Sequence, residues 1–408
     1  MLSVDEARSR VLTAVAVLES IERPVRESRG YVVAADLAAP HSLPRFDNSA
    51  MDGYAVKAED VSAATEQTPV TLRLDGEVRA GDPGDLEVTS GAAVRIMTGA
   101  PLPPGADAIV PVEVTEETDG KVVVKQASPS GKHVRPAGDD VQEGEVVVRA
   151  GSELTAGEMA LLASLGLSPV PVVRRPRVGI LVTGDELVAP EEEPGPGQIR
   201  DSNSVALTAL VEEAGGEAMT FRAVGDERES TVDALARAAE SADLVVSSGG
   251  VSVGRYDFVK DAVERLGRID AWRVAMQPGK PVVLGAVGDT PFLGLPGNPV
   301  SIHAGFEQFV RPAIRKMRGC RTLLRPTVTA TMTETIEKVA GRLHFVRVRL
   351  ALRDDEWLAT PTGPQGSHIQ SSLVECDGLA RFEREATTLA TGDRVVVEVW
   401  RLPQMEER

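Results

Sequence analysis

Short apolar runs alternate with amphipathic stretches between residues 174 and 319, and this alternation constrains the fold more than any other feature of the chain. Runs such as VGILV, DLVVSS and PVVLGAV have the length and composition of buried strands. The stretches between them, such as NSVALTALVEEAGG and TVDALARAAESA, place their apolar residues at helical spacing. Because strands that alternate with helices indicate βαβ units, we expect a doubly wound αβα domain with a mostly parallel sheet.

The regions on either side show a different pattern, in which short alternating runs are separated by turn residues. Between residues 69 and 150, the runs VTLRL, AVRIM and KVVVK are separated by DG, GDPG and PPG. This pattern predicts a small β domain. Beyond residue 320, HFVRVRLAL and TGDRVVVEVW alternate in the same way and predict a second β domain at the C-terminal end.

Two helices are predicted by the spacing of their capping residues. Ser3 and Glu6 have capping-box spacing at the start of the chain, and Thr155 and Glu158 repeat it before an apolar run that Gly166 would end. Acidic residues precede the first apolar run, so this segment is expected to be a helix of the folded protein and not a signal peptide. Its predicted apolar face consists of Val4, Ala7, Val11, Val15 and Leu18.

Composition excludes several classes of partner. The 408 residues carry a formal net charge of −17 and only 3% aromatic residues, so neither phosphate attraction nor base stacking favours nucleic acid. No apolar run approaches the ~18 residues that span a bilayer, so no membrane partner is expected. Cys320 and Cys376 are far apart and outside metal-ligand spacing, which favours a reducing compartment and a cytoplasmic location.

Four polar loops are expected to leave strand ends of the αβα domain. They are TGDE (183–186), SSGGVSVG (247–254), QPGK (277–280) and LPGNP (295–299). Ligands of open parallel sheets bind at the carboxyl ends of the strands, where glycines let backbone N–H groups approach an anion. One such loop alone is more simply a tight turn, but four at one sheet favour an anion site. Neither a P-loop nor a G-x-G-x-x-G fingerprint is present at these turns.

Carboxylates follow the same strands. Glu186 and Asp257 come after two of them, and Asp226 and Glu227 come after AMTFRAV. Carboxylates beside phosphate-binding loops make chemical sense if Mg²⁺ bridges them to a phosphate, although each alone could be an ordinary solvated charge. No G-x-S-x-G elbow supports a hydrolase triad. Ser367, in GPQGSHI, could be a nucleophile or a hydrogen-bond donor, and its glycine neighbours favour the donor.

Seven motifs in order carry a family resemblance: PRFDNSAMDGYAV, RIMTGAPLPPGADAIV, TGDEL, SSGGVSVG, PGKP, LPGNPVS and GPQGSHI. Together they resemble the molybdopterin molybdenumtransferases, the molybdenum insertases that include the E domain of gephyrin. The resemblance runs from about residue 3 to 400. It implies that adenylylated molybdopterin binds with Mg²⁺ and molybdate, that the phosphoanhydride is cleaved and AMP leaves, and that the dithiolene holds molybdenum.

The resemblance also implies an architecture and partners. It implies a homodimer whose chains have four domains, with transient contacts to the upstream adenylyltransferase and to apo-molybdoenzymes. The first domain would be discontinuous and the sheet domain adenylyltransferase-like. The implied boundaries are 1–40 with 141–173 for the first domain, 41–140 for the inserted β domain, 174–319 for the αβα domain and 320–408 for a C-terminal β-barrel-like domain.

Site residues follow from the same motifs by resemblance. The implied catalytic residues are Asp52, Asp140, Glu186 and Asp257, and the implied Mg²⁺ ligands are Glu186, Asp226, Glu227 and Asp257. Lys280, Ser301, Arg347 and Ser367 resemble an oxyanion pocket for molybdate. The full set implied to bind substrate is Thr98, Ser248, Gly249, Gly250, Arg273, Gln277, Lys280, Pro296, Pro299, Ser301, Arg342, Arg347 and Ser367.

The chain departs from the family pattern at two places. The family often has two lysines around the P-G-K segment, where this sequence has Arg273 and Gln277. Gln277 keeps a hydrogen-bond donor but loses a charge. The usual pair of aspartates after the third strand is Asp226 and Glu227, so one carboxylate is longer by a methylene.

Two other functions remain open at this point. One is adenylylation of molybdopterin, because the sheet domain resembles the adenylyltransferase that acts one step earlier. Those relatives are small single-domain proteins and typically carry TGGTG where this chain has SGGVSVG. The other is a non-catalytic scaffold, because gephyrin also clusters receptors. The carboxylates and Lys280 argue against a scaffold alone.

Overall fold

The computed structural model describes residues 1–223, 228–250 and 258–403, so the predictions for Asp226, Glu227 and Asp257 lie outside the described residues. The chain divides into two compact units. Unit 1 consists of Met1–Ala35, Ala150–Ala156 and Pro169–Arg408, and unit 2 of Asp36–Arg149 and Gly157–Ser168. The finer division into four domains stays a prediction. No helix of the described residues is long and apolar enough to cross a membrane.

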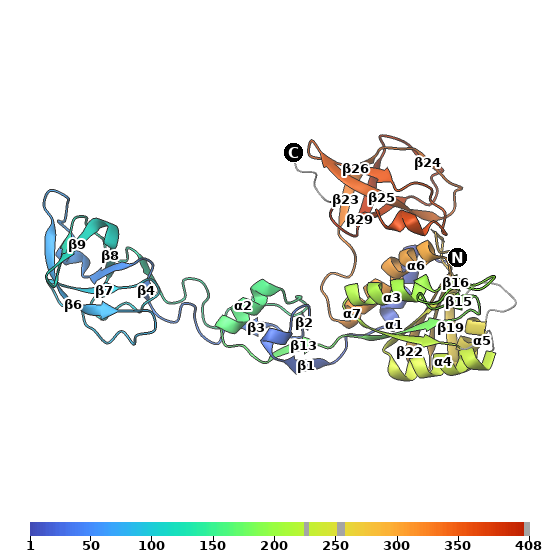
Figure 1. Cartoon of the computed structure of the whole chain (residues 1–408), viewed down its shortest axis with the longest axis horizontal. Coiled ribbons are helices and arrows are strands. Elements are labelled where there is room, and N and C mark those ends of the chain that lie inside the picture. Colours follow the sequence, from blue (N-terminus) through green and yellow to red (C-terminus); the bar gives the residue numbers. More distant parts are fainter. Residues whose placement is uncertain (224–227, 251–257, 404–408) are drawn as a thin grey trace. The chain divides into compact units, whose positions relative to one another are not determined.

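A six-stranded mixed sheet forms the centre of the αβα part of unit 1, which confirms the predicted fold class (Figure 1). Its order is β17-β14-β18-β22-β21-β19. The first four of these strands run parallel, whereas β21 and β19 are antiparallel and form one edge. In that order the strands are β17 (Glu217–Arg222), β14 (Arg177–Val182), β18 (Leu244–Ser248), β22 (Thr290–Leu295), β21 (Pro281–Val287) and β19 (Gly267–Arg273).

Helices cover both faces of this sheet, because each face presents a row of apolar side chains that must be removed from water. Figure 1 shows α4 (Arg228–Ser241) and α5 (Phe258–Leu266) on one face. Their buried residues pack with Leu181, Val245 and Val283. The other face carries α1 (Val4–Ala14), α3 (Ser202–Glu213) and the continuous run α6 (Pro299–Gly305), a π-helix (Phe306–Val310) and α7 (Arg311–Met317).

The capping box at the start of α1 is confirmed. The Ser3 hydroxyl accepts the N–H of Glu6, and the Ser3 N–H donates to the Glu6 carboxylate at 2.7 Å. The helix nevertheless ends earlier than the apolar pattern predicts, because Val15 is already extended. Val15 is still buried against the sheet, so the spacing that looked helical beyond Ala14 comes from an extended segment on the same apolar core.

The C-terminal strands close into a five-stranded barrel, as predicted. They pair in the cycle β25-β26-β23-β29-β27 and back to β25, which leaves no open edge among these five. The strands are β23 (Thr327–Met332), β25 (Leu343–Arg353), β26 (Glu356–Pro361), β27 (Gly378–Phe382) and β29 (Arg394–Val399). A two-residue strand, β20 (Met276–Gln277), pairs with Leu343 and His344 of β25 and so joins the barrel to the segment that enters β21.

Unit 2 contains the predicted small β domain, built on a six-stranded sheet of order β8-β5-β7-β6-β10-β9. These strands are β8 (Ala108–Pro111), β5 (Gly53–Val56), β7 (Ala92–Ile96), β6 (Val70–Val78), β10 (Lys121–Val124) and β9 (Thr115–Thr118). Unit 1 also contains a three-stranded sheet of β1 (Ser20–Arg23), β13 (Val170–Val173) and β2 (Val32–Val33).

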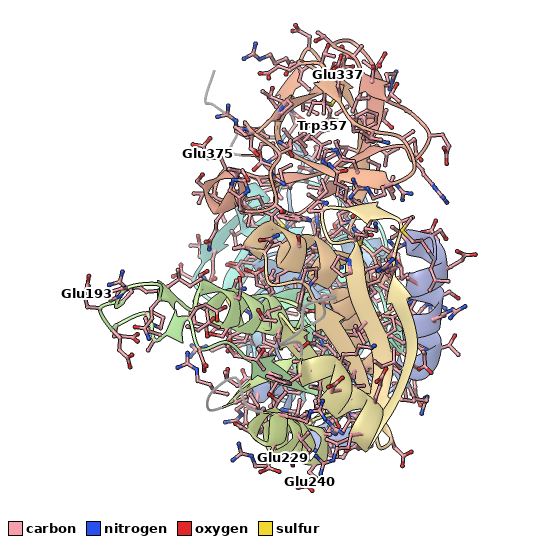
Figure 2. The ribbon with its side chains drawn as sticks, turned by 90° about the vertical axis from the view of Figure 1, so that its right-hand side faces the viewer. Glu193, Glu229, Glu240, Glu337, Trp357 and Glu375 are labelled. Atoms are coloured by element: carbon pink, nitrogen blue, oxygen red, sulfur yellow. The ribbon has the colours of Figure 1, made fainter. Side chains whose placement is uncertain are left out.

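The remaining elements are short. They are α2 (Ala156–Ser164), β3 (Leu37–Ala38), β4 (Asn48–Ser49), β11 (Val134–Arg135), β12 (Val146–Val148), β15 (Leu187–Val188), β16 (Ile199–Arg200), β24 (Ile336–Glu337), β28 (Thr388–Leu389) and the 3₁₀ turns Val25–Glu27, Ala58–Val61, Val112–Val114 and Gln370–Leu373. Figure 2 shows Glu193, between β15 and β16, directed away from the αβα part, and Glu229 and Glu240 at its outer surface on α4. These glutamates are part of the acidic excess of the chain.

Candidate functional site

Three of the four polar loops meet at one edge of the αβα sheet. The register pairs Val182 with Ser248 and Ser248 with Leu295, so β14, β18 and β22 end side by side. The QPGK loop was predicted to leave a strand of the αβα sheet. It instead leaves β20, which belongs to the barrel sheet, and enters β21. Since β21 is antiparallel to β22, its beginning lies at the same edge. The hairpin that joins β21 to β22, in which Val287 opposes Thr290, brings this loop to the others.

The loop after β18 turns on two glycines. Gly249 and Gly250 have φ angles of 86° and 69°, a region that L side chains rarely adopt. The Gly249 N–H donates to the carbonyl of Leu295 at 2.9 Å, which ties this loop to the end of β22. Ser248, predicted to contact substrate, is buried at the strand end. The structure therefore confirms the turn, while the predicted contacts of these residues with substrate remain predictions.

A polar cavity of about 320 Å³ lies beside these loops in unit 1. Its walls come from the segment before β21, the start of α6, the residue before β25 and the loop that precedes Ser367. It is lined by Gln277, Pro278, Gly279, Pro281, Pro296, Asn298, Ser301, Arg342, Gln365, Gly366 and Ser367. Five of the predicted substrate-binding residues are thus brought together: Gln277, Pro296, Ser301, Arg342 and Ser367.

Two polar residues of the lining were not predicted. Asn298 lies in LPGNP and Gln365 in GPQGSHI, so both flank predicted residues within motifs that the sequence had singled out. Asn298 precedes α6 but makes no side-chain cap with it, and its Nδ2 donates instead to Oγ of Ser367 at 3.1 Å. The Val300 N–H donates to the carbonyl of Ser367 at 3.2 Å. These two bonds hold the Ser367 loop against the first turn of α6.

Arg347 has a different place from the one that the resemblance implied. It is completely buried and does not line the cavity. Its Nε donates to Oγ of Ser372 at 2.7 Å, and its Nη2 donates to the carbonyls of Pro364 and Gly366 at 3.0 and 3.2 Å. Burial lowers the pKa of the Arg347 guanidinium. Arg347 therefore holds the cavity loop from behind, because strand alternation directs it to the outside of the barrel under that loop.

Three further predicted residues surround the cavity without lining it. Lys280 and Arg273 are exposed, and Arg273 ends β19 opposite Pro281. Pro299 is the first residue of α6, where its fixed φ suits a helix start. The predicted oxyanion group of Lys280, Ser301, Arg347 and Ser367 is thus only partly assembled, with Ser301 and Ser367 on the cavity wall.

Asp52 and Thr98 form a second predicted cluster, in unit 2. Thr98 donates to Oδ1 of Asp52 twice, from its backbone N–H at 2.7 Å and from its hydroxyl at 2.8 Å. These bonds favour the ionised form and hold the pKa of the exposed Asp52 carboxyl below its usual value. Asp140 is also exposed in unit 2, and its N–H donates to the carbonyl of Leu43.

Glu186 is the one predicted Mg²⁺ ligand whose structure is described. It lies after β14 and is exposed, so its carboxylate is available to a ligand. Across residues 1–223, 228–250 and 258–403, no three His, Cys, Asp or Glu side chains are grouped so as to hold a metal. The other three predicted ligands lie outside these ranges, so the magnesium site remains a prediction.

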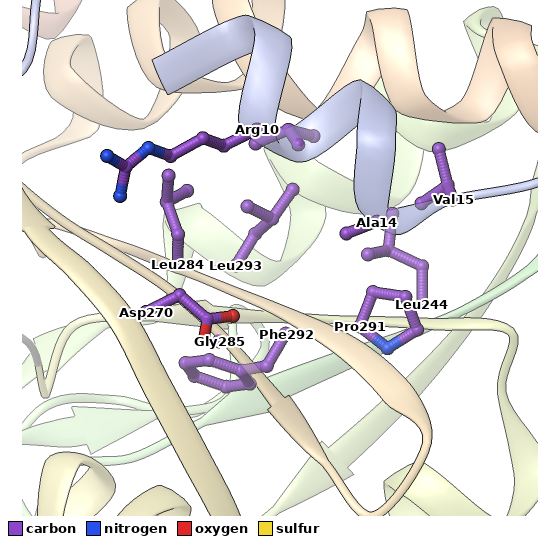
Figure 3. A pocket seen from close by; sticks show the side chains of 11 residues that line it. Arg10, Ala14, Val15, Leu244, Asp270, Leu284, Gly285, Pro291, Phe292 and Leu293 are labelled. Atoms are coloured by element: carbon purple, nitrogen blue, oxygen red, sulfur yellow. The ribbon is translucent and has the colours of Figure 1, made fainter. Parts of the chain in front are cut away.

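A second hollow, of about 30 Å³, lies between α1 and the sheet (Figure 3). Leu244, Leu284 and Leu293 contribute to a mostly aliphatic lining, and Arg10 and Asp270 are its charged residues. This volume accommodates only about one or two water molecules. None of the predicted site residues lines it, so it is not a candidate for substrate binding.

Fold and cavity define a multidomain α/β protein with a polar ligand cavity between a doubly wound sheet and a small barrel. Comparison with known families refines this class. Residues 2–166 match the MoeA N-terminal region (domains I and II), residues 179–316 a probable molybdopterin binding domain, and residues 329–400 the MoeA C-terminal region (domain IV).

Full-length relatives agree. Molybdopterin molybdenumtransferase 2 of Mycobacterium tuberculosis is 40% identical, over 98% of this chain and all of the relative. Molybdopterin molybdenumtransferase of Haemophilus influenzae is 37% identical, over 98% of each chain. The crystal structure of a molybdopterin biosynthesis MoeA protein from Pyrococcus horikoshii superposes with a TM-score of 0.84 at 32% identity, over 98% of this chain and 99% of that one. The chain belongs to the MoeA family of molybdopterin molybdenumtransferases, which are enzymes of molybdenum cofactor biosynthesis.

Proposed function

We propose that this transferase inserts molybdenum from molybdate into adenylylated molybdopterin, with cleavage of the phosphoanhydride and release of AMP. The observation that carries the proposal is the polar cavity, which gathers five residues implied by the motifs. Molybdate is a tetrahedral dianion, and such an anion is held by several hydrogen-bond donors and positive charge. Ser301 and Ser367 offer hydroxyl donors in this cavity, and Gln277 and Asn298 offer amide donors.

The pterin and its phosphates are assigned to the neighbouring loops. The backbone N–H of Gly250 suits a phosphate oxygen, because no side chain keeps an anion away from the backbone at either glycine, whereas the Gly249 N–H is already bonded to the carbonyl of Leu295. Exposed Lys280 and Arg273 would add positive charge at the same edge of the sheet. On this assignment Asp52 and Thr98 contribute from unit 2, where their mutual hydrogen bonds hold the Asp52 carboxylate ionised and oriented.

Magnesium is part of the proposal. Carboxylate oxygens are the protein ligands that Mg²⁺ prefers, and Glu186 offers an exposed carboxylate beside the glycine loop. Asp226, Glu227 and Asp257 would complete the ligand set. Bound Mg²⁺ would neutralise phosphate charge during cleavage of the phosphoanhydride. If this assignment is correct, a chelator should abolish AMP release and added Mg²⁺ should restore it.

Assembly and cellular context complete the proposal. We infer a homodimer in which the inserted β domain of one chain completes the cleft of the other, as the family resemblance implies. Adenylylated molybdopterin would come from the upstream adenylyltransferase, and apo-molybdoenzymes would receive the product. The two cysteines are both free and buried, which is compatible with a reducing cytoplasm.

The deciding experiment supplies purified protein with adenylylated molybdopterin, molybdate and Mg²⁺. The proposal expects molybdate-dependent AMP release and activation of an added apo-molybdoenzyme. Pyrophosphate release from ATP and unmodified molybdopterin would identify an adenylyltransferase instead. A folded protein that shows neither reaction would leave the scaffold as the surviving alternative.

A further inference from the structure

The LPGNP loop (295–299) connects the two places to which the proposed function assigns ligands. Two of its residues, Pro296 and Asn298, line the polar cavity assigned to molybdate. Gly297, between them, lies against the glycine turn assigned to the phosphates, because a Cβ built on Gly297 would be 3.7 Å from the Gly249 Cα. The position of Gly297 therefore relates the cavity to the glycine turn.

A side chain from outside these loops holds Gly297. Asn203 lies in the first turn of α3, and its Nδ2 donates to the carbonyl of Gly297 at 2.8 Å. Among the described residues, this amide is the only hydrogen-bond donor to that carbonyl. Asn203 is half-buried and does not line the cavity, so its effect on a ligand there must pass through the loop.

The start of α3 is itself firmly held, so Asn203 projects from a fixed base. Asp201 is the N-cap of this helix and is buried, and it accepts both the N–H of Ser204 at 3.0 Å and its hydroxyl at 2.6 Å. The Asp201 N–H donates to the carbonyl of Val188 at 2.9 Å. Arg222, at the end of β17, lies 3.5 Å from the same carboxylate. The helix start is thus bonded to β15 and β17.

We propose that Asn203 is a positioning residue that couples the cavity to the glycine turn by holding Gly297 between them. The reaction needs both ligands at once, and a misplacement of about 1 Å can slow such a reaction about a hundredfold. An amide suits this place because it donates to a carbonyl without adding a charge beside the anions. The inference rests on the proposed function for the identity of the two ligands, and it assigns Asn203 no contact with either.

The first test measures AMP release by the purified full-length protein with adenylylated molybdopterin and Mg²⁺, at increasing molybdate concentration. Asn203→Leu and Asn203→Asp keep the approximate shape of the side chain but cannot donate to the carbonyl. We expect kcat to fall about tenfold to a hundredfold in both, while the KM for molybdate changes less than about threefold. Asn203→Gln keeps an amide donor on a longer side chain and should recover part of the rate.

Two features of this series separate positioning from a loss of folding. A carboxylate is favourable in the first turn of a helix, so Asn203→Asp should remain folded, as checked by thermal unfolding. Ser202→Ala is the matched control, because it removes a polar group from the adjacent position of α3 and leaves the Asn203 amide in place. Its kcat should equal that of the wild type.

Hydrogen exchange supplies a readout that does not depend on the reaction. The Gly249 N–H, bonded to the carbonyl of Leu295 at 2.9 Å, reports on the glycine turn. The Val300 N–H, bonded to the carbonyl of Ser367 at 3.2 Å, reports on the cavity. If Gly297 couples the two, Asn203→Leu should accelerate exchange at both amides, whereas Ser202→Ala should accelerate neither.

Four outcomes would overturn the inference. They are wild-type AMP release by the two variants that lack the donor, a loss confined to the KM for molybdate, an equal loss in Ser202→Ala, or faster exchange at Val300 without any change at Gly249. The two proposals remain distinguishable. A wild type that releases no AMP, together with faster exchange at both amides of Asn203→Leu, would refute the proposed function alone. AMP release that is indifferent to Asn203→Leu would refute this inference alone.

Discussion

At the scale of single residues, the arginines of β25 and its start show how one residue type takes different roles. Arg342 lines the polar cavity, Arg347 is buried and holds a loop, and Arg349 pairs with Glu375 at the surface at 2.9 Å. Arg347 and Arg349 are two residues apart and so lie on the same face of β25, and it is the loop packed over Arg347 that gives it a different role. The sequence motif that contains Arg347 predicted its importance but not whether it touches the anion or the loop.

Arg347→Lys tests the structural role of Arg347. Lysine keeps the charge but cannot donate to the Ser372 hydroxyl and to the carbonyls of Pro364 and Gly366 together. At least one of these three acceptors therefore loses its hydrogen bond. We expect the free energy of unfolding to fall by about 1–3 kcal/mol, measured by urea denaturation. Hydrogen exchange of residues 363–368 should accelerate. Arg349→Lys, at an exposed ion pair, should change stability by less than about 0.5 kcal/mol. Equal effects of the two substitutions would contradict the role assigned to Arg347.

Thr98→Val tests the environment of Asp52. Wild-type Asp52 should titrate below the ordinary value of about 3.9, because the two bonds from Thr98 favour the carboxylate. Valine removes the hydroxyl donor, so the pKa should rise toward the ordinary value, as followed by NMR of the Asp52 side-chain carboxyl carbon. Because the folded pKa is depressed, the stabilisation linked to Asp52 is present at neutral pH and is lost as the pH falls through the folded pKa. Thr118→Val, on strand β9 away from Asp52, is the control, and identical titrations in both variants would refute the assignment.

At the scale of secondary-structure elements, the site depends on turns that only certain backbones can make. Gly249 needs its positive φ so that the chain can leave β18 and bond to the end of β22. Gly297, in the neighbouring loop, has no such requirement, and a Cβ there would meet only the Gly249 Cα at an ordinary distance of 3.7 Å. The two glycines therefore look alike in sequence but differ in backbone demand.

Gly249→Ala and Gly297→Ala form a matched pair that tests this difference. Alanine at Gly249 must adopt a left-handed conformation, so the free energy of unfolding should fall by about 1–2 kcal/mol. Alanine at Gly297 fits its backbone and available space, so its effect should stay within about 0.5 kcal/mol. Chemical denaturation of both variants decides the matter. A Gly297→Ala variant that is as destabilised as Gly249→Ala would show that packing, and not φ, controls these loops.

At the scale of the whole molecule, subunit complementation tests the proposed sharing of the cleft between chains. Asp52→Ala and Glu186→Gln homodimers should each be nearly inactive in AMP release. When the two variants are unfolded and refolded together, about half of the dimers are mixed. If Asp52 acts on the other chain, each mixed dimer keeps one intact cleft of its two. About a quarter of wild-type activity should therefore return. Clefts built within single chains would give no recovery after verified subunit exchange, because every chain carries one lesion.

Much of the architecture could be predicted from the sequence alone. The alternation of apolar runs and helical spacing is a local property of the chain, so the αβα domain, the flanking β domains and the cap of α1 were accessible without coordinates. The ordered motifs likewise identified the family, because short segments at a site carry its chemistry in their own residues. Composition also argues against nucleic acid as a partner, and that expectation stays a prediction.

Only the tertiary structure decided how those segments meet. The five-strand closure of the barrel pairs β25 with β27, where His344 opposes Phe382, and the start of the QPGK loop pairs with β25, where Gln277 opposes His344. The cavity likewise joins Gln277 to Arg342 and Ser367, which come from three distant segments. Spacing along a chain specifies which side of a strand or helix a residue occupies, but not which distant residue faces it. For that reason the sequence predicted an anion site, and the fold alone placed Arg342 on its wall and Arg347 behind it.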